Sequence, residues 1–165
     1  MPRAAIVMGS DSDFEKLKGC IGVLKKFNIE TEVRVISAHR TPSEAENFAK
    51  NAEENGIEVI IAAAGKAAHL GGVLAAFTTL PVIGVPIKSS TMDGLDSLLS
   101  MVQMPKGIPV ATVAIDGGDN AAILAVQMLS LKYGYLKDKL KEFKYQMAEE
   151  VKEKDRKMQK TVESL

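Results

Sequence analysis

A histidine and an arginine stand side by side at positions 39 and 40, inside the hexapeptide Ser37–Pro42. A histidine side chain has an unperturbed pKa of about 6.5, so it can donate and accept protons near neutral pH. An arginine guanidinium binds phosphate or carboxylate groups through a planar fork of N–H donors. His39 beside Arg40 therefore predicts catalysis on a small anionic metabolite.

The residues around this hexapeptide predict a strand over 31–36 followed by a helix over 42–50. Thr41 is expected to cap this helix through its hydroxyl group, and Pro42 suits the first helical turn. The histidine and the arginine then lie at the carboxyl end of a strand, where open α/β sheets bind their ligands.

A second polar turn, Gly9–Asp13, separates a predicted strand over 3–8 from a predicted helix over 14–27. Ser12 and Glu15 have the spacing of a capping box. Free backbone N–H groups at such a helix start can bind an anion, but the turn can equally be a plain capped connection. It matches neither GxGxxG nor the P-loop lysine motif, so no dinucleotide or ATP site is predicted.

A third segment of small residues, Ala64–Gly72, follows a near-continuous apolar strand predicted over 57–63. Such a run is typical of a strand buried on both faces of a parallel sheet. The segment contains His69, which competes with His39 for the catalytic role. Because apolar residues flank His69, we interpret it as a structural or ligand-orienting histidine.

Strands over 81–86 and 109–115 and helices over 73–78, 95–102 and 121–131 complete the predicted domain. Five strands alternating with helices predict an α/β fold, a three-layer doubly wound parallel sheet. The strand order 2-1-3-4-5 would place one crevice among residues from three loops, namely Ser10, Asp13, His39, Arg40 and Gly65.

Residues 1–134 are expected to form the catalytic domain, and residues 135–165 predict one long amphipathic helix. Its apolar stripe comprises Leu136, Leu140, Phe143, Met147 and Val151. Because the core helices are already accounted for, we expect the stripe to pack on a neighbouring subunit. Docking on its own domain is the alternative.

The 165 residues include 46% hydrophobic and 25% charged residues, with 21 basic and 21 acidic side chains. This balance disfavours nucleic acid or an anionic membrane as the main partner. Cys20 is the single cysteine and is read as buried rather than reactive, which fits a reducing cytoplasm. The chain shows no apolar run of about 18 residues and no signal-peptide pattern. With two histidines 30 positions apart, no metal site is predicted.

Seven blocks of the sequence recur together in one known family: 8–13, 37–42, 64–70, 80–86, 94–105, 107–112 and 120–125. With these blocks, residues 3–131 resemble the PurE family of purine biosynthesis. The Ser37–Pro42 block and the block ending at Thr112 resemble the class I mutases and differ from the class II carboxylases.

The resemblance implies a flavodoxin-like domain in a homo-octamer. It also implies conversion of N5-carboxyaminoimidazole ribonucleotide to 4-carboxy-5-aminoimidazole ribonucleotide without metal, nucleotide cofactor or ATP. By motif position, Ser10, Ser12 and Arg40 would hold the phosphate of this ribotide, and Asp13 would contact its ribose. His39 would act first as general acid and then as base.

The remaining substrate-binding residues implied are Ser37 and Ala38 beside His39, and Gly65, Lys66, His69 and Leu70 in a loop that closes the pocket. The family usually has Gly where Lys66 stands and Pro where Gly71 stands. Lys66 either meets the substrate carboxylate or points into solvent.

There are five alternative readings. A carboxylase that uses free CO2 is the nearest rival on this scaffold. A receiver module is disfavoured because the third strand ends in Ala63–Gly65 without an aspartate, and a flavin carrier because aromatic residues make up 5% and Trp is absent. Ser97 lacks the GxSxG context of a nucleophilic serine enzyme. A purely structural oligomer is the last possibility.

Overall fold

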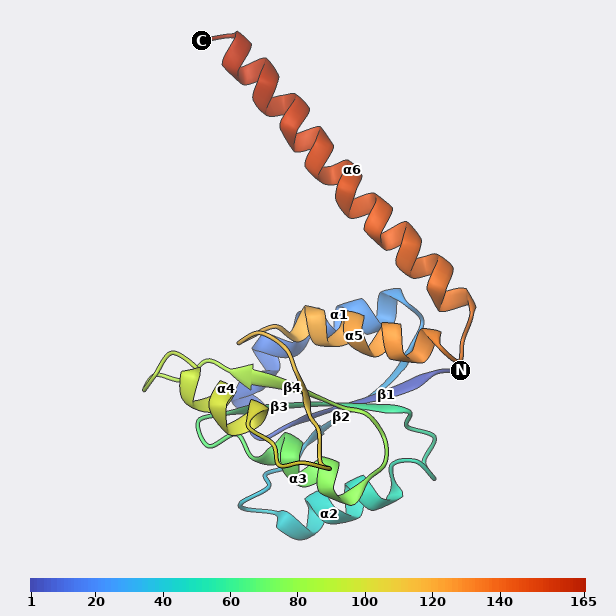
Figure 1. Cartoon of the computed structure of the whole chain (residues 1–165), viewed down its shortest axis with the longest axis vertical. Helices are drawn as coiled ribbons and strands as arrows, with labels where there is room; N and C mark the ends of the chain where they lie inside the picture. The colour runs from blue at the N-terminus through green and yellow to red at the C-terminus, as the bar shows by residue number, and fades with distance from the viewer.

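The computed structural model describes all 165 residues and contains one sheet of five parallel strands in the order β2-β1-β3-β4-β5 (Figure 1). The predicted strand order is therefore confirmed. The strands are β1 Arg3–Met8, β2 Glu30–Val35, β3 Val59–Gly65, β4 Val82–Ile87 and β5 Ala111–Thr112.

Helices cover both faces of this sheet, as a three-layer α/β fold requires. They are α1 Phe14–Lys26, α2 Pro42–Asn51, α3 Leu70–Phe77, α4 Leu95–Val102, α5 Gly118–Ser130 and α6 Tyr135–Glu163, with a short 3-10 helix at Asp11–Asp13. Helices α1 and α5 lie on one face, and α2 and α3 lie on the other (Figure 1). Two apolar cores follow, one on each side of the sheet, and the central strands β3 and β4 are almost entirely buried between them.

Strand β5 is much shorter than the predicted segment 109–115, because only Ala111 and Thr112 pair with β4. Pro109 has no N–H to donate to a ladder, which shortens the strand at its start. Beyond Thr112, the N–H of Val113 donates to the Gly84 carbonyl of β4 at 3.0 Å, and the N–H of Asp116 donates to the Pro86 carbonyl at 2.8 Å. The last strand is thus a short edge, and the loop that follows it stays hydrogen-bonded to β4.

Both capping predictions are wrong. Thr41 stands at the start of α2, but its hydroxyl oxygen accepts the Ser37 N–H at 3.0 Å and donates to the Ser37 carbonyl at 2.9 Å. Ser12 lies inside the 3-10 turn, and α1 begins after Asp13 without a side-chain cap. These hydroxyl groups form hydrogen bonds within loops at the carboxyl edge of the sheet, and they do not accept hydrogen bonds from the first N–H groups of α1 and α2.

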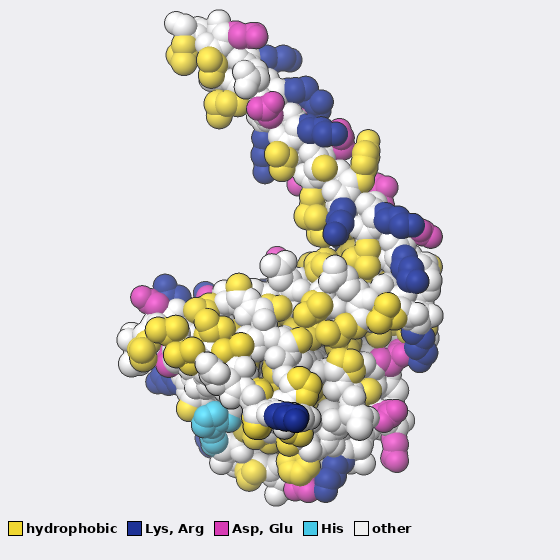
Figure 2. Space-filling view, viewed as in Figure 1, with side chains coloured by type: hydrophobic (Ala, Val, Ile, Leu, Met, Phe, Trp, Pro, Cys, Tyr) yellow, Lys and Arg dark blue, Asp and Glu magenta, His cyan; other side chains and the backbone are white.

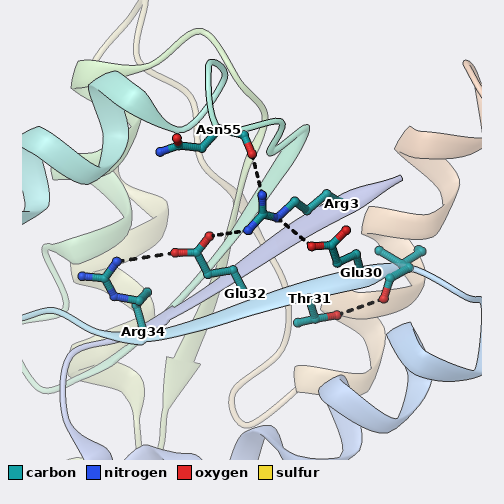
Figure 3. Close-up of polar contacts among 7 residues, drawn as sticks. Arg3, Glu30, Thr31, Glu32, Arg34 and Asn55 are labelled. Atoms are coloured by element: carbon teal, nitrogen blue, oxygen red, sulfur yellow. Dashed lines mark hydrogen bonds and ion pairs between the residues drawn. The ribbon is translucent and has the colours of Figure 1, made fainter. Parts of the chain in front are cut away.

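The outer strand β2 carries charged side chains at alternate positions, and they form ion pairs with Arg3 of the neighbouring strand β1 and with one another (Figure 3). The Arg3 guanidinium lies 3.4 Å from Glu30 and 3.0 Å from Glu32, and it donates to the Asn55 carbonyl at 2.6 Å. Glu32 also meets Arg34 at 3.4 Å. Charged side chains on an edge strand discourage pairing with other chains.

Helix α6 is anchored to the domain only through its first turns. Leu136 is fully buried, and the Phe143 ring packs edge-on against Phe27 with 5.8 Å between ring centroids. Farther along, Met147 and Val151 are exposed, and the helix extends away from the domain (Figure 1). None of the helices combines the length and apolar composition needed to cross a bilayer.

Two glycines provide a matched test of the packing. A methyl group on Gly84 in β4 would lie 2.7 Å from Met101 Cγ and 2.9 Å from Val110 Cγ1, whereas one on Gly22 in α1 meets no atom within 4 Å. We expect Gly84→Ala to destabilise the fold by about 1–3 kcal/mol through overpacking. Gly22→Ala should stabilise it by about 0.5–1 kcal/mol. Urea unfolding measures both, and equal effects would contradict the packing described.

Candidate active site

The carboxyl ends of the first four strands lie at one edge of the sheet. Met8 is in register with Val35 of β2 and with Ala63 of β3, and Ala63 is in register with Val85 of β4. The loops that follow these strands therefore meet, as they do at ligand sites of open α/β sheets.

A cavity of about 680 Å³ opens at this edge. All eleven residues singled out from the sequence line it: Ser10, Ser12, Asp13, Ser37, Ala38, His39, Arg40, Gly65, Lys66, His69 and Leu70. The prediction that these residues surround one crevice is confirmed. Sequence reasoning missed the wall at the end of β4, formed by the last strand residue, Ile87, and by Lys88, Ser89 and Ser90. Its position at the carboxyl end of the fourth strand could have indicated that it lines the crevice, because the neighbouring strands end at the same edge of the sheet.

The two histidines contact each other across this cavity. His39 Nε2 and His69 Nδ1 lie 2.8 Å apart, and the rings are nearly perpendicular, at 88°. One nitrogen must donate a proton and the other accept it, so the two rings cannot both carry a proton at this contact. The histidines are therefore one unit rather than alternatives. His69 stands directly before α3, which fixes its backbone.

The turn that carries His39 is closed by its own hydrogen bonds. The hydroxyl oxygen of Ser37 accepts the backbone N–H of Arg40 at 3.1 Å and the Arg40 Nε–H at 3.4 Å. The Thr41 N–H donates to the Ser37 carbonyl at 2.8 Å. Ser37 thus orients the arginine and leaves the remaining guanidinium donors available for an anion.

The turn after β1 places two hydroxyl groups and one carboxyl group in the cavity. Ser10 Oγ lies 2.9 Å from Ser12 Oγ and accepts the Ser12 N–H at 3.3 Å. Asp13 is 8% exposed. Burial raises the pKa of the Asp13 carboxyl, the charges of Asp116 and Asp11 add to this, and a hydrogen bond from the Ser10 backbone partly opposes it.

Positive charge dominates the lining. Arg40, Lys66 and Lys88 line the cavity together with a single carboxyl group, that of Asp13. Lys88 pairs with the exposed Asp93 at 3.2 Å, but no ion pair of 4.0 Å or less involves Arg40 or Lys66. Two cations without carboxylate partners suit a ligand that carries more than one anionic group. No three His, Cys, Asp or Glu side chains lie close enough to share a metal ion.

Comparison with known proteins places this site in context. A family model described as AIR carboxylase matches residues 3–150. An N5-carboxyaminoimidazole ribonucleotide mutase of Pyrococcus abyssi is 60% identical, over 89% of this chain and 84% of the relative. A phosphoribosylaminoimidazole carboxylase of Candida glabrata is 51% identical, over 96% of this chain and 28% of that longer protein. The crystal structure of Treponema denticola PurE superposes with a TM-score of 0.87 at 31% identity, covering 95% of this chain and 98% of that one.

The buried Asp13 carboxyl gives a pH-dependent prediction. Because its pKa is raised in the folded chain, the native state binds more protons than the unfolded state in the pH range between the ordinary value of 3.8 and this raised pKa. Its contribution to stability is therefore lost as pH rises through that range, and the ionised group costs stability at pH 7. We expect Asp13→Asn to raise the melting temperature at pH 7. The matched change at exposed Asp138, Asp138→Asn, should not. A lower melting temperature for Asp13→Asn would contradict the assignment.

Proposed function

Because the chain belongs to the AIR carboxylase (PurE) family, we propose that it is an isomerase of purine biosynthesis. It converts N5-carboxyaminoimidazole ribonucleotide into 4-carboxy-5-aminoimidazole ribonucleotide. The observation that carries this proposal is the contact between His39 and His69 in a cavity with two unpaired cations. The buried free thiol of Cys20 supports a reducing, cytoplasmic setting for the reaction.

The charges of the cavity match those of the substrate, which carries a phosphate and a carboxylate. Arg40, with the hydroxyl groups of Ser10 and Ser12, holds the phosphate. Asp13 accepts hydrogen bonds from the ribose hydroxyl groups. Lys66 lines the same cavity without a carboxylate partner, and it meets the carboxylate that moves in the reaction.

The reaction needs one proton donor that later becomes an acceptor. His39 protonates the carbamate nitrogen N5, the C–N bond breaks, and CO2 leaves the aminoimidazole ring. Carbon C4 of this electron-rich ring then attacks the CO2 carbon, and His39 takes the C4 proton to restore the aromatic ring. The net change moves one proton from C4 to N5 and one carboxyl group from N5 to C4. One histidine can serve both steps because its ordinary pKa lies near neutral pH.

His69 is a positioning residue in this scheme. Its hydrogen bond to His39 fixes the ring orientation and determines which nitrogen of the pair carries the proton. The loops Ser10–Asp13 and Gly65–Leu70 line the cavity and close over the substrate. Holding CO2 against C4 is an orientation effect, and exclusion of water keeps CO2 from escaping as bicarbonate.

Carboxylation of aminoimidazole ribonucleotide by free CO2 is the second candidate, because a relative named as a carboxylase is 51% identical to this chain. The two activities differ only in the origin of the CO2. The discriminating experiment compares fresh N5-carboxyaminoimidazole ribonucleotide without added bicarbonate against aminoimidazole ribonucleotide with high bicarbonate. The mutase forms the 4-carboxy product from the first substrate at low concentration. Product from the second alone would establish the carboxylase, and product from neither would refute both.

Replacement of His39 tests its assigned chemistry. We expect His39→Asn to lower kcat by about 10²–10⁴-fold, the usual loss when a general acid–base is removed. His69→Asn should cost less, because it removes orientation rather than the transferred proton. Steady-state assays measure both, with circular dichroism and sedimentation as controls for folding and assembly. Wild-type kcat in His39→Asn would leave only a structural role for this residue.

We further propose that copies of the chain assemble, into the octamer that the family resemblance implies. Two apolar surfaces support self-association. The projecting part of α6 exposes Met147, Val151, Met158 and Val162 (Figure 2), and α4 exposes Leu95, Leu99 and Val102. The spacing of these four α6 residues places them along one side of the helix, so a neighbouring subunit is the partner that we assign to this projecting part of the helix.

Adjacent positions on α6 test this interface. Val151→Glu places a charge in the stripe, whereas Lys152→Glu changes a charge about 100° around the helix. We expect the first to reduce the assembly measured by sedimentation velocity and the second to leave it unchanged. Val151 is exposed in the single chain, so its replacement should change the free energy of unfolding of an isolated subunit very little. Equal masses for both variants and the wild type would contradict the assigned contact.

A further inference from the structure

Asp116 lies just outside the cavity and contacts three different segments around it. Its Oδ1 accepts the backbone N–H of Lys88 at 2.9 Å, and its Oδ2 lies 2.8 Å from Lys16 Nζ. Its own N–H donates to the Pro86 carbonyl at 2.8 Å. One side chain therefore joins the loop after β5 to the loop after β4 and to the first turn of α1.

Each of these partners belongs to a part of the chain that shapes the cavity. Lys88 is itself a lining residue in the wall after β4. Lys16 stands three residues after Asp13, in the helix that continues from the Ser10–Asp13 turn. Asp116 thus connects the Ser10–Asp13 turn, through Lys16, to the wall that contains Lys88, and Asp116 itself does not line the cavity.

Hydrogen bonds to both carboxylate oxygens restrain Asp116. Its φ is +57°, in the left-handed region, which aspartate adopts more readily than most residues other than glycine. Burial acts to raise the pKa of its carboxyl, but hydrogen bonds from Lys16 and from the Lys88 N–H outweigh burial and lower the pKa. The next helix leaves little freedom either, because a Cβ on Gly118 would lie 3.1 Å from the Lys16 carbonyl oxygen.

We propose that Asp116 is a positioning residue for substrate binding, which sets the spacing between the Ser10–Asp13 turn and the Lys88–Ser90 wall without touching the substrate. The inference rests on the proposed function for its kinetic consequence, whereas the geometry of the two segments can be measured independently of turnover. The ion pair to Lys16 and the hydrogen bond to Lys88 use different oxygen atoms of Asp116, so the ion pair can be removed while the hydrogen bond is kept.

Three variants separate these contributions. Asp116→Gly removes both contacts and tolerates the positive φ. Asp116→Asn keeps an oxygen acceptor for the Lys88 N–H and loses the charge that faces Lys16. Lys16→Met removes the same ion pair from the other side.

Glu58→Gln is the matched control. Glu58 pairs with Lys132 at 2.6 Å, and its side chain is 20% exposed, against 23% for Asp116. It directly precedes β3, so it lies at the amino edge of the sheet, opposite the cavity.

We expect Asp116→Gly to raise KM for the ribotide by about tenfold, the loss that one charge-assisted contact represents, with a smaller change in kcat. Asp116→Asn and Lys16→Met should each raise KM by about threefold, and the double variant should do no more than either, since both remove one ion pair. Glu58→Gln should leave KM unchanged.

Hydrogen exchange provides the readout that is independent of turnover. In Asp116→Gly, the amides of Ser12 and Asp13 should exchange faster than in the wild type, while Glu58→Gln leaves them unchanged. Unchanged exchange at these amides would overturn the inference. So would a KM within twofold of an active wild type. An inactive wild type would refute the proposed function alone, and the exchange result would still decide the role of Asp116.

Discussion

The parallel pairing of β1 with both β2 and β3 is the constraint on which the site depends. It places the ends of strands that are far apart in sequence within one sheet edge, at Met8, Val35 and Ala63. Every group assigned to the reaction lies in a loop that leaves this edge. A change in strand order would separate His39 from His69, and no local sequence feature could restore their contact.

The chemistry of the cavity follows from what those loops bring together. A pair of histidines with one hydrogen bond between them can hold and return a proton, and Arg40 and Lys66 leave positive charge available for the ligand. The buried Asp13 adds a carboxyl group that opposes folding in its ionised form. Such a group is typical of a site where binding, rather than stability, determines the residue.

The layers of the fold could be predicted from local patterns, because apolar periodicity and strand-to-helix alternation indicate helices on both faces of a parallel sheet. The strand order does not follow from these patterns, because doubly wound sheets occur with more than one order. Pro42 was correctly placed in the first turn of α2. The hydrogen-bond partners of the Ser12 and Thr41 hydroxyl groups were predicted wrongly, because these partners depend on how each loop closes. The contact between His39 and His69 and the role of Asp116 depend on residues 30 to 100 positions apart, which no local pattern reveals.

In the proposed reaction, the carboxyl carbon released from N5 stays in one closed cavity until it is bonded to C4. The measurement uses N5-carboxyaminoimidazole ribonucleotide labelled with ¹³C in its carbamate, with the wild-type protein in buffer that contains unlabelled bicarbonate. Nuclear magnetic resonance then follows the label at early turnover. A closed cavity predicts that the label appears in the C4 carboxylate of the product. Label in dissolved bicarbonate, with an unlabelled product carboxylate, would contradict it.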